Sequence, residues 1–255
     1  MNFMKRIQTI TAYLVVLVLA GVSSLKSAEP GHVPGKATVR SVSGACTYTD
    51  TSGMAHKLRV NMELDAGATI STGPDSFVYL NINGLTSSVR VGSETSMSIP
   101  TMERIGAARD SDTVTMLDLR TGGIEGNVKK VAANSQYEIK TPHGVAGIRG
   151  TDFNITVTLL PSGEYQVTFT SVTGQIIVSA IVNGASVVRT LNDHESWTPG
   201  YGDVVPTPVK LLDTYLREID DMINYLQQTG LPTVTVPEKY PTGNPPGGGS
   251  SSPHK

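Results

Sequence analysis

The 255-residue chain has a single cysteine, a single tryptophan and few aromatic residues of any kind. Cys46 has no partner for an intramolecular disulfide, so the fold must be stabilised by packing, and we expect this thiol to be buried rather than bridged to another chain. No apolar run reaches the roughly 18 residues of a membrane span. The formal net charge of −2 gives no sign of the basic surface that nucleic-acid binding needs.

The most apolar segment, Thr11–Val22, follows Lys5 and Arg6 and precedes several small residues. This order is typical of a secretory signal, and about twelve residues are too few for a membrane anchor. We therefore expect residues 1–28 to be removed and the mature protein to be periplasmic or secreted, touching the membrane only through this leader. The mature charge becomes −4, or −5 if Lys26 leaves as well, because residues 1–28 contain no Asp or Glu. We expect no nucleic-acid partner.

Glycine is abundant, with 26 residues, and the chain is rich in Val, Ile and Thr. Residues 36–205 consist of short alternating stretches separated by Gly, Asn, Asp, Ser and Pro. This pattern predicts an all-β domain, an antiparallel β-sandwich of jelly-roll type, with a barrel or a β-helix as the alternatives.

Three stretches and three turns make this pattern specific. Apolar residues on one face of a strand are Val78, Leu80 and Ile82; Phe153, Ile155, Val157 and Leu159; and Tyr165, Val167 and Phe169. Hairpin turns are predicted at Asn83-Gly84, Pro161-Ser162-Gly163 and Asn183-Gly184. Residues 103–112 have neither a helical nor a strand period and predict a longer loop.

A helical period begins after Pro206, and it predicts an amphipathic helix over residues 207–230. Its apolar stripe is Val209, Leu212, Leu216, Ile219, Ile223 and Leu226. Thr207 is the expected N-cap, with Pro208 at the first helical position, and Gly230 is the expected end. We favour packing of this stripe on the β domain; the alternative is a partner helix or a homo-oligomer contact through Leu212, Leu216, Ile219 and Ile223. Residues 237–255 are too poor in apolar groups to fold, so we expect them to be disordered.

The most specific motif lies between two predicted strands, from Tyr137 to Phe153. Its marked residues are Thr141, Pro142, Gly144, Gly147, Arg149, Gly150, Thr151 and Phe153. This segment resembles the signature of the FecR domain family, in which Thr-Pro and small apolar residues lead to Val/Ile-Arg-Gly-Thr-x-Phe. The likeness extends upstream through 64–80 and 89–97 and downstream to Gly174–Val178, so it covers roughly residues 60–180.

The signature also has a structural interpretation that needs no ligand. Pro142 keeps Thr141 out of helical geometry, and glycines at strand junctions allow tight turns or close backbone approach. Arg149 stands between an isoleucine and a glycine, where we expect a partly buried guanidinium that ties loops by hydrogen bonds, with an anion contact as the alternative.

No residue set with the spacing of a catalytic, metal or cofactor site is found, so we predict no enzyme activity, no cofactor and no metal. The densest acid and imidazole cluster, Asp193-His194-Glu195, cannot converge on one face of a strand and predicts a solvated loop. Trp197 is a conceivable sugar platform for a glycan-binding or enzyme accessory, although a core role is the better prediction.

The resemblance implies a compact β-sandwich that acts by protein interaction in the cell envelope. Known members relay substrate status from an outer-membrane transporter to a cytoplasmic sigma factor, which suggests an accessory role in iron-siderophore uptake signalling. Those regulators carry an anti-sigma segment and a membrane span before the domain, whereas only a few residues precede the apolar segment here, so we do not expect direct control of a sigma factor. We therefore expect a protein-interaction or scaffold module with an envelope protein as partner.

Overall fold

The structure is a computed structural model that describes residues 31–84, 86–106, 111–129 and 134–228. The predicted signal peptide (1–28) and the predicted disordered tail (237–255) lie outside these residues. The chain divides after Gly31, and the elements below belong to the part that begins at His32.

Two sheets share one long strand, β10 (Asp112–Val128), whose first half pairs in one sheet and whose second half pairs in the other. The first sheet contains β4 (Ala55–Lys57), β3 (Cys46–Thr49), β6 (Thr69–Thr72), β9 (Ser96–Ile105), β10, β11 (Gln136–Thr141), β12 (Gly144–Ile148), β15 (Ile176–Val182) and β16 (Ala185–Leu191), with β1 (His32–Pro34) beside β9. The second sheet contains β5 (Glu63–Leu64), β2 (Ala37–Ser43), β7 (Phe77–Ile82), β8 (Ser87–Val91), β10, β13 (Thr151–Leu159), β14 (Tyr165–Thr173), β17 (Glu195–Trp197) and β18 (Val205–Pro206).

The strand pairings are antiparallel with one exception in the described residues, the parallel pair of β10 and β11. All three predicted hairpins are confirmed, because β7 pairs with β8, β13 with β14 and β15 with β16. At Asn183-Gly184 both residues have positive φ, as a two-residue hairpin turn requires. Asn83 and Gly84 also have positive φ, and they begin the four-residue connection between Ile82 and Ser87. The all-β class, the antiparallel pairing and the C-terminal helix are thus confirmed, while the sandwich and jelly-roll shape remain predictions.

The long strand β10 changes sheets where it reaches two glycines. Its pairing with β9 shifts register twice before Thr121, and Gly122 follows with a φ of 85°. A Cβ on Gly122 would lie 2.5 Å from the Cα of Thr95, so both the backbone angle and the close approach of another strand require glycine here. The bend lets one strand bind both sheets together.

The apolar core takes side chains from both sheets. Across the second sheet the register places Val91, Ile124, Ile155, Phe169 and Trp197 side by side, and all five are buried. The expected burial of Cys46 is confirmed, and its Sγ donates to the carbonyl of Ser43 at 3.2 Å. Burial raises the pKa of this thiol, which keeps it protonated and unreactive.

Two local expectations are corrected. The loop predicted over 103–112 is shorter, because β9 continues to Ile105 and pairs there with β1 and β10, while β10 already begins at Asp112. Leu159, predicted to share the buried face of its strand, is 55% exposed at the end of β13. A strand that runs beyond the sheet it packs on leaves its last apolar side chain in water.

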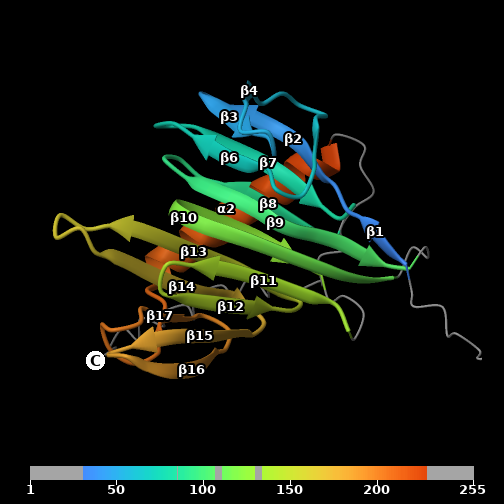
Figure 1. Ribbon diagram of the computed structural model, residues 1–255. Coiled ribbons are helices and arrows are strands. Elements are labelled where there is room, and N and C mark those ends of the chain that lie inside the picture. Colours follow the sequence, from blue (N-terminus) through green and yellow to red (C-terminus); the bar gives the residue numbers. More distant parts are fainter. Residues whose placement is uncertain (1–30, 85, 107–110, 130–133, 229–255) are drawn as a thin grey trace, which may run out of the picture. The chain divides into compact units, whose positions relative to one another are not determined.

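The helix α2 (Val209–Gln228) packs on the outer face of the second sheet, the face turned away from the core. Figure 1 draws it in red behind the strands, and it contacts β8, β10 and β14. Its buried residues Ile219, Met222, Ile223 and Leu226 form a small apolar cluster with Tyr79 and Val172 of the sheet. The packing of the stripe on the β domain, which the sequence favoured, is therefore confirmed.

The helix begins two residues later than predicted, and its expected end at Gly230 lies outside the described residues. The hydroxyl of Thr207 shares a hydrogen bond with Ser196 at 2.8 Å, so the residue predicted as a cap ties the helix start to β17 instead. Val209, predicted in the stripe, is 72% exposed. Met222, which the prediction omitted, is fully buried.

Candidate interaction surface

The signature segment begins at the turn between β11 and β12. The Thr141 side chain is buried; its hydroxyl donates to the carbonyl of Gly144 at 2.9 Å and accepts from the amide of the same residue at 3.2 Å. A Cβ on Gly144 would lie 2.5 Å from the carbonyl oxygen of Ser179 on β15. Thr141 therefore closes the turn, and Gly144 lets two strands approach.

The other end of the segment is built in the same way. The buried Thr151 hydroxyl donates to the carbonyl of Gln175 at 3.0 Å, and a Cβ on Gly174 would lie 2.6 Å from the carbonyl oxygen of Gly150. Phe153 follows in the core with no exposed surface. These contacts hold β12, β13 and β15 at fixed spacing, whereas a Cβ on Gly147 would meet nothing closer than 3.8 Å.

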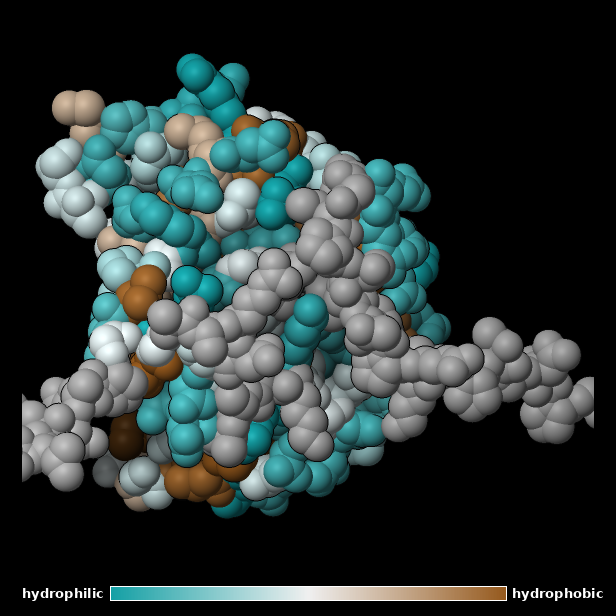
Figure 2. Space-filling model, turned by 90° about the vertical axis from the view of Figure 1, so that its right-hand side faces the viewer, coloured by the Kyte–Doolittle hydropathy of each residue, from teal (hydrophilic) through white to brown (hydrophobic). Residues whose placement is uncertain are grey.

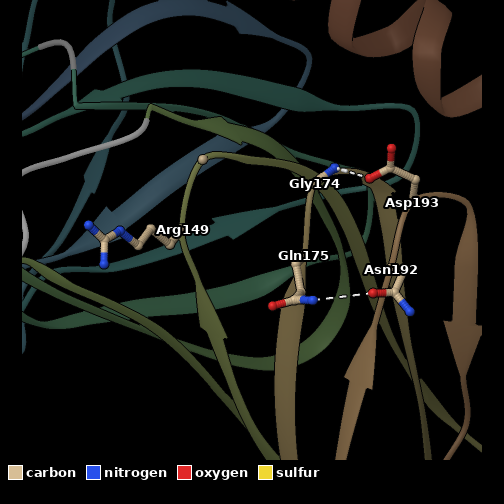
Figure 3. A pocket seen from close by; sticks show the side chains of 6 residues that line it. Arg149, Gly174, Gln175, Asn192 and Asp193 are labelled. Carbon is tan, nitrogen blue, oxygen red and sulfur yellow. Dashed lines mark hydrogen bonds between the residues drawn. The ribbon is translucent and has the colours of Figure 1, made fainter.

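Arg149 does not have the partly buried position that the sequence predicted. The residue is exposed, and its guanidinium has no hydrogen-bond or ion-pair partner among the described residues, so it makes no loop tie there. It lines an open hollow of about 580 Å³ together with Gly150, Gly174, Gln175, Asn192 and Asp193. Figure 3 shows its side chain pointing away from the opposite wall, where Asp193 accepts from the amide of Gly174 at 2.6 Å.

The acid and imidazole cluster beside this hollow does not converge. Asp193 binds the amide of Gly174, while Glu195 accepts from the amide of Asn192 at 2.7 Å. His194 has a φ of 63°, and its carbonyl accepts from the amide of Thr207 at 2.7 Å. Across the described ranges, no three His, Cys, Asp or Glu side chains are grouped as a metal site. Each of these residues orders a loop.

A second hollow, of about 520 Å³, opens at the other end of β12. Its lining is Pro142, His143, Gly144, Val145, Ser179, Ala180 and Ile181. The two hollows therefore flank the outer face of β12, β15 and β16, a surface that the signature segment helps to build.

That outer face carries large apolar side chains in water. Ile177, Ile181 and Val188 are 52%, 60% and 56% exposed, and Val145 is half-buried in the row that aligns with Val188. Figure 2 shows brown patches low on the molecule, at the level where Figure 1 draws β15 and β16. Residues of this kind, gathered on one sheet face, indicate a contact surface.

The strand at the rim of this face has an open edge. Among the described strands only β15 forms a ladder with β16, and that ladder has no bulge. Its one charged residue, Arg189, lies on the opposite face of the strand from Val188; its side chain is 43% exposed, with the guanidinium 5.9 Å from the ring centroid of Trp197 and 3.6 Å from Asp203. The outward residues Ser186, Val188 and Thr190 carry no charge. Edge strands usually carry charge or proline against unwanted pairing, and β16 has neither on its open side.

The helix residues proposed for interaction lie elsewhere. Ile219 and Ile223 are buried against the second sheet, and Leu212 and Leu216 are half-buried in the same cluster. The stripe is thus used within the chain. The expected core role of Trp197 is confirmed, because it is 2% exposed and its indole N–H donates to the carbonyl of Gly202 at 3.0 Å. A buried indole cannot serve as a sugar platform.

Comparison with protein families gives one match, to the FecR protein family, over residues 68–176. The match confirms the predicted FecR resemblance over residues 68–176. The matched segment extends from the residue before β6 to the first residue of β15, so it contains the whole signature segment but only part of the lining of each hollow. The strand β16 and the helix α2 lie beyond it. FecR domains are typical of envelope-associated signalling or regulatory proteins rather than of enzymes.

Among solved structures, two crystal structures of a proposed anti-sigma factor from Parabacteroides distasonis ATCC 8503 are similar to this chain. Their sequence identities are 14% and 15%, and both have a TM-score of 0.43. The similarity covers 58% and 62% of this chain and 64% and 72% of those chains, so the first is spanned over less than two thirds of its length. No curated protein matches. No helix in the described part of the chain is long and apolar enough to cross a membrane.

The open apolar face was missed at the sequence level, although a signal was present. Residues 176–182, Ile-Ile-Val-Ser-Ala-Ile-Val, are apolar at both parities of the strand. Alternate residues point to opposite faces, so such a strand has apolar side chains outside as well as inside. The inner residues Ile176, Val178 and Ala180 are buried, and Ile177 and Ile181 are left in water.

Proposed function

We propose that this chain is an exported, non-catalytic interaction module of the cell envelope, and that it presents the outer face of β12, β15 and β16 to another envelope protein. The observation that carries the proposal is the pairing of three exposed apolar side chains with an open strand edge. The FecR match supports an envelope role, and the leader-like residues 1–28 support export.

The partner chemistry follows from the surface. The open edge of β16 presents unpaired backbone groups, which an extended segment can satisfy by adding as a strand. Ile181 and Val188 stand on the outer face beside that edge, so alternate apolar side chains of the segment would lie on them. The expected partner is therefore an envelope protein with an exposed, extended segment of alternating apolar residues.

Site-specific crosslinking in intact cells tests the proposal. A photoreactive phenylalanine analogue replaces Val188 in one strain and Val60 in another; Val60 is 50% exposed but lies between β4 and β5, remote from β16 in the pairing order. We expect one discrete adduct from position 188 and none from position 60. Val188→Lys in the presence of a crosslinker at Ile181 should abolish that adduct.

Equal adducts from both positions, or none from position 188, would remove the proposed surface. Export is tested separately by fractionating cells that express the full chain or a chain lacking residues 1–28. Recovery of both forms in the same compartment would contradict an exported role and leave the surface untouched.

A second candidate is an accessory role in iron-siderophore uptake signalling, which the FecR match favours. It predicts that deletion changes the transcription of siderophore-receptor genes in iron-poor medium, and that Val188→Lys reproduces the change. Unchanged transcripts in the deletion strain would reject it, while the crosslinking result would still decide the interaction role.

A further inference from the structure

Under α2, the outer face of the second sheet carries a row of polar side chains beside the apolar cluster of Tyr79 and Val172. The register aligns Arg90, Glu125, Asn154, Thr170 and Ser196 across β8, β10, β13, β14 and β17. Four of these residues are buried, and the fifth, Arg90, has a side chain 19% exposed. A buried polar row needs internal partners, because unpaired groups are costly away from water.

Most of the row is internally paired. Glu125 accepts from Arg90 at 2.9 Å and from the side-chain amide of Asn154 at 3.3 Å. Thr170 shares a hydrogen bond with Ser196 at 2.9 Å. Arg90 also lies over the ring of Phe77, 5.2 Å from its centroid, so its guanidinium is held in place from two sides.

The helix adds a second carboxylate to the same arginine. Glu218 of α2 lies 3.7 Å from Arg90, which already pairs with Glu125. The titratable and charged groups that face Glu125 are Arg90 from β8, Tyr79 from β7, and Glu218 and Tyr215 from α2. One cation thus serves two carboxylates, one on the sheet and one on the helix.

Such a pair favours binding a proton. Burial and, to a smaller extent, the nearby Glu218 raise the pKa of Glu125 to about 7 against the opposing effect of Arg90. A second carboxyl of the helix behaves alike: burial and then the charge of Asp152 raise the pKa of Asp220. Tyr79 and Tyr215 also have raised pKa values, so both stay neutral below pH 10.

We propose that α2 is a proton-dependent strap: uptake of a proton between Glu125 on the sheet and Glu218 on the helix tightens its docking, and loss of that proton loosens it. The protonated carboxyl donates a hydrogen bond to the other, where two carboxylates would repel. Undocking exposes this polar row together with the apolar cluster that Tyr79 and Val172 form with the helix, so the proton adjusts a docking equilibrium to which apolar packing also contributes.

The direction of the pH dependence follows from the thermodynamic linkage between docking of α2 and proton binding at Glu125. Docking raises the pKa of Glu125 above its ordinary value of 4.5, so the docked state binds more protons than the undocked one. Docking is therefore strongest below pH 4.5, weakens as the pH rises toward 7, and is weakest above 7. Asp220 acts in the same direction.

Hydrogen exchange of the full chain tests the strap, with protection of α2 amides compared at pH 8 and pH 5.5 after correction for the intrinsic rate. Amides of β7 serve as the internal reference. We expect protection of α2 to rise on the order of tenfold at the lower pH. Glu125→Gln and Glu218→Gln, which remove the two paired carboxyls, should each reduce this pH dependence to the smaller part that Asp220 contributes. Glu164→Gln, at an exposed loop position, should keep the wild-type dependence.

Two results overturn the proposal: equal α2 protection at both pH values in the wild-type chain, or an unchanged pH dependence in Glu218→Gln. The helix variant decides the matter if Glu125→Gln fails to fold, because the Glu218 side chain is 32% exposed and tolerates replacement.

Discussion

The outer faces of the two sheets do not follow the usual rule that a covered face is apolar and an open face is polar. The outer face of the second sheet is lined by Arg90, Glu125 and Asn154, yet α2 covers it. The outer face of β12, β15 and β16 is lined by Ile177, Ile181 and Val188, yet it is open. Residue type alone therefore does not decide which face is covered. The polar groups of the covered face have hydrogen-bond partners inside the chain, whereas the apolar side chains of the open face remain available for binding.

The largest expected effect on this comparison comes from weakening the packing of α2 on the second sheet. Met222 has no exposed surface and packs between the helix and the sheet, so Met222→Ala should reduce the stability of the docked helix by about 2–5 kcal/mol. Hydrogen exchange should show α2 losing protection while β9 and β10 retain theirs. Asn224→Ala, at an exposed position of the same helix, is the control and should change little. Loss of protection throughout both sheets would instead make α2 part of one cooperative unit.

A smaller effect is expected at β10, the strand that the two sheets share. Gly122→Ala introduces a Cβ at a φ of 85° and against the backbone of Thr95, so it should cost about 1–3 kcal/mol. Chemical denaturation gives the change in the free energy of unfolding. Gly123→Ala is the matched control, since a Cβ there meets nothing closer than 3.5 Å. Equal costs at the two positions would contradict the bend as the reason for glycine.

The smallest effect on folding should occur on the open face. Val188→Lys replaces an exposed side chain, so we expect the free energy of unfolding to change by less than about 0.5 kcal/mol. Val89→Lys, at a fully buried position of β8, should unfold the protein. A large loss of stability from Val188→Lys would mean that the open face is structural and would weaken its proposed role in binding.

Local chemistry explains what the sequence could predict. The turns at Asn83-Gly84 and Asn183-Gly184 were identified because few other residue pairs adopt positive φ twice in succession. The stripe of α2 was identified because its period is visible within twenty residues. These signals depend on residues close together in the sequence, so they can be recognised without knowledge of the fold.

Contacts between distant segments explain what the sequence could not predict. Tyr79 occupies the predicted wet face of β7, and it is buried because α2 arrives from well over a hundred residues away. Glu125 gave no signal as a buried acid, since its partners Arg90 and Glu218 are remote in sequence. Arg149 belongs to a recognisable motif, but whether its side chain reached a partner depended on loops that the motif does not include.

The order of synthesis gives the polar row another significance. The helix α2 is the last described element, so every strand of the second sheet leaves the ribosome before its cover exists. An apolar outer face would be exposed throughout that interval and would invite aggregation. Arg90, Glu125, Asn154 and Thr170 keep much of this face polar during that interval, and the helix is needed to cover only its smaller apolar part, which includes Tyr79 and Val172.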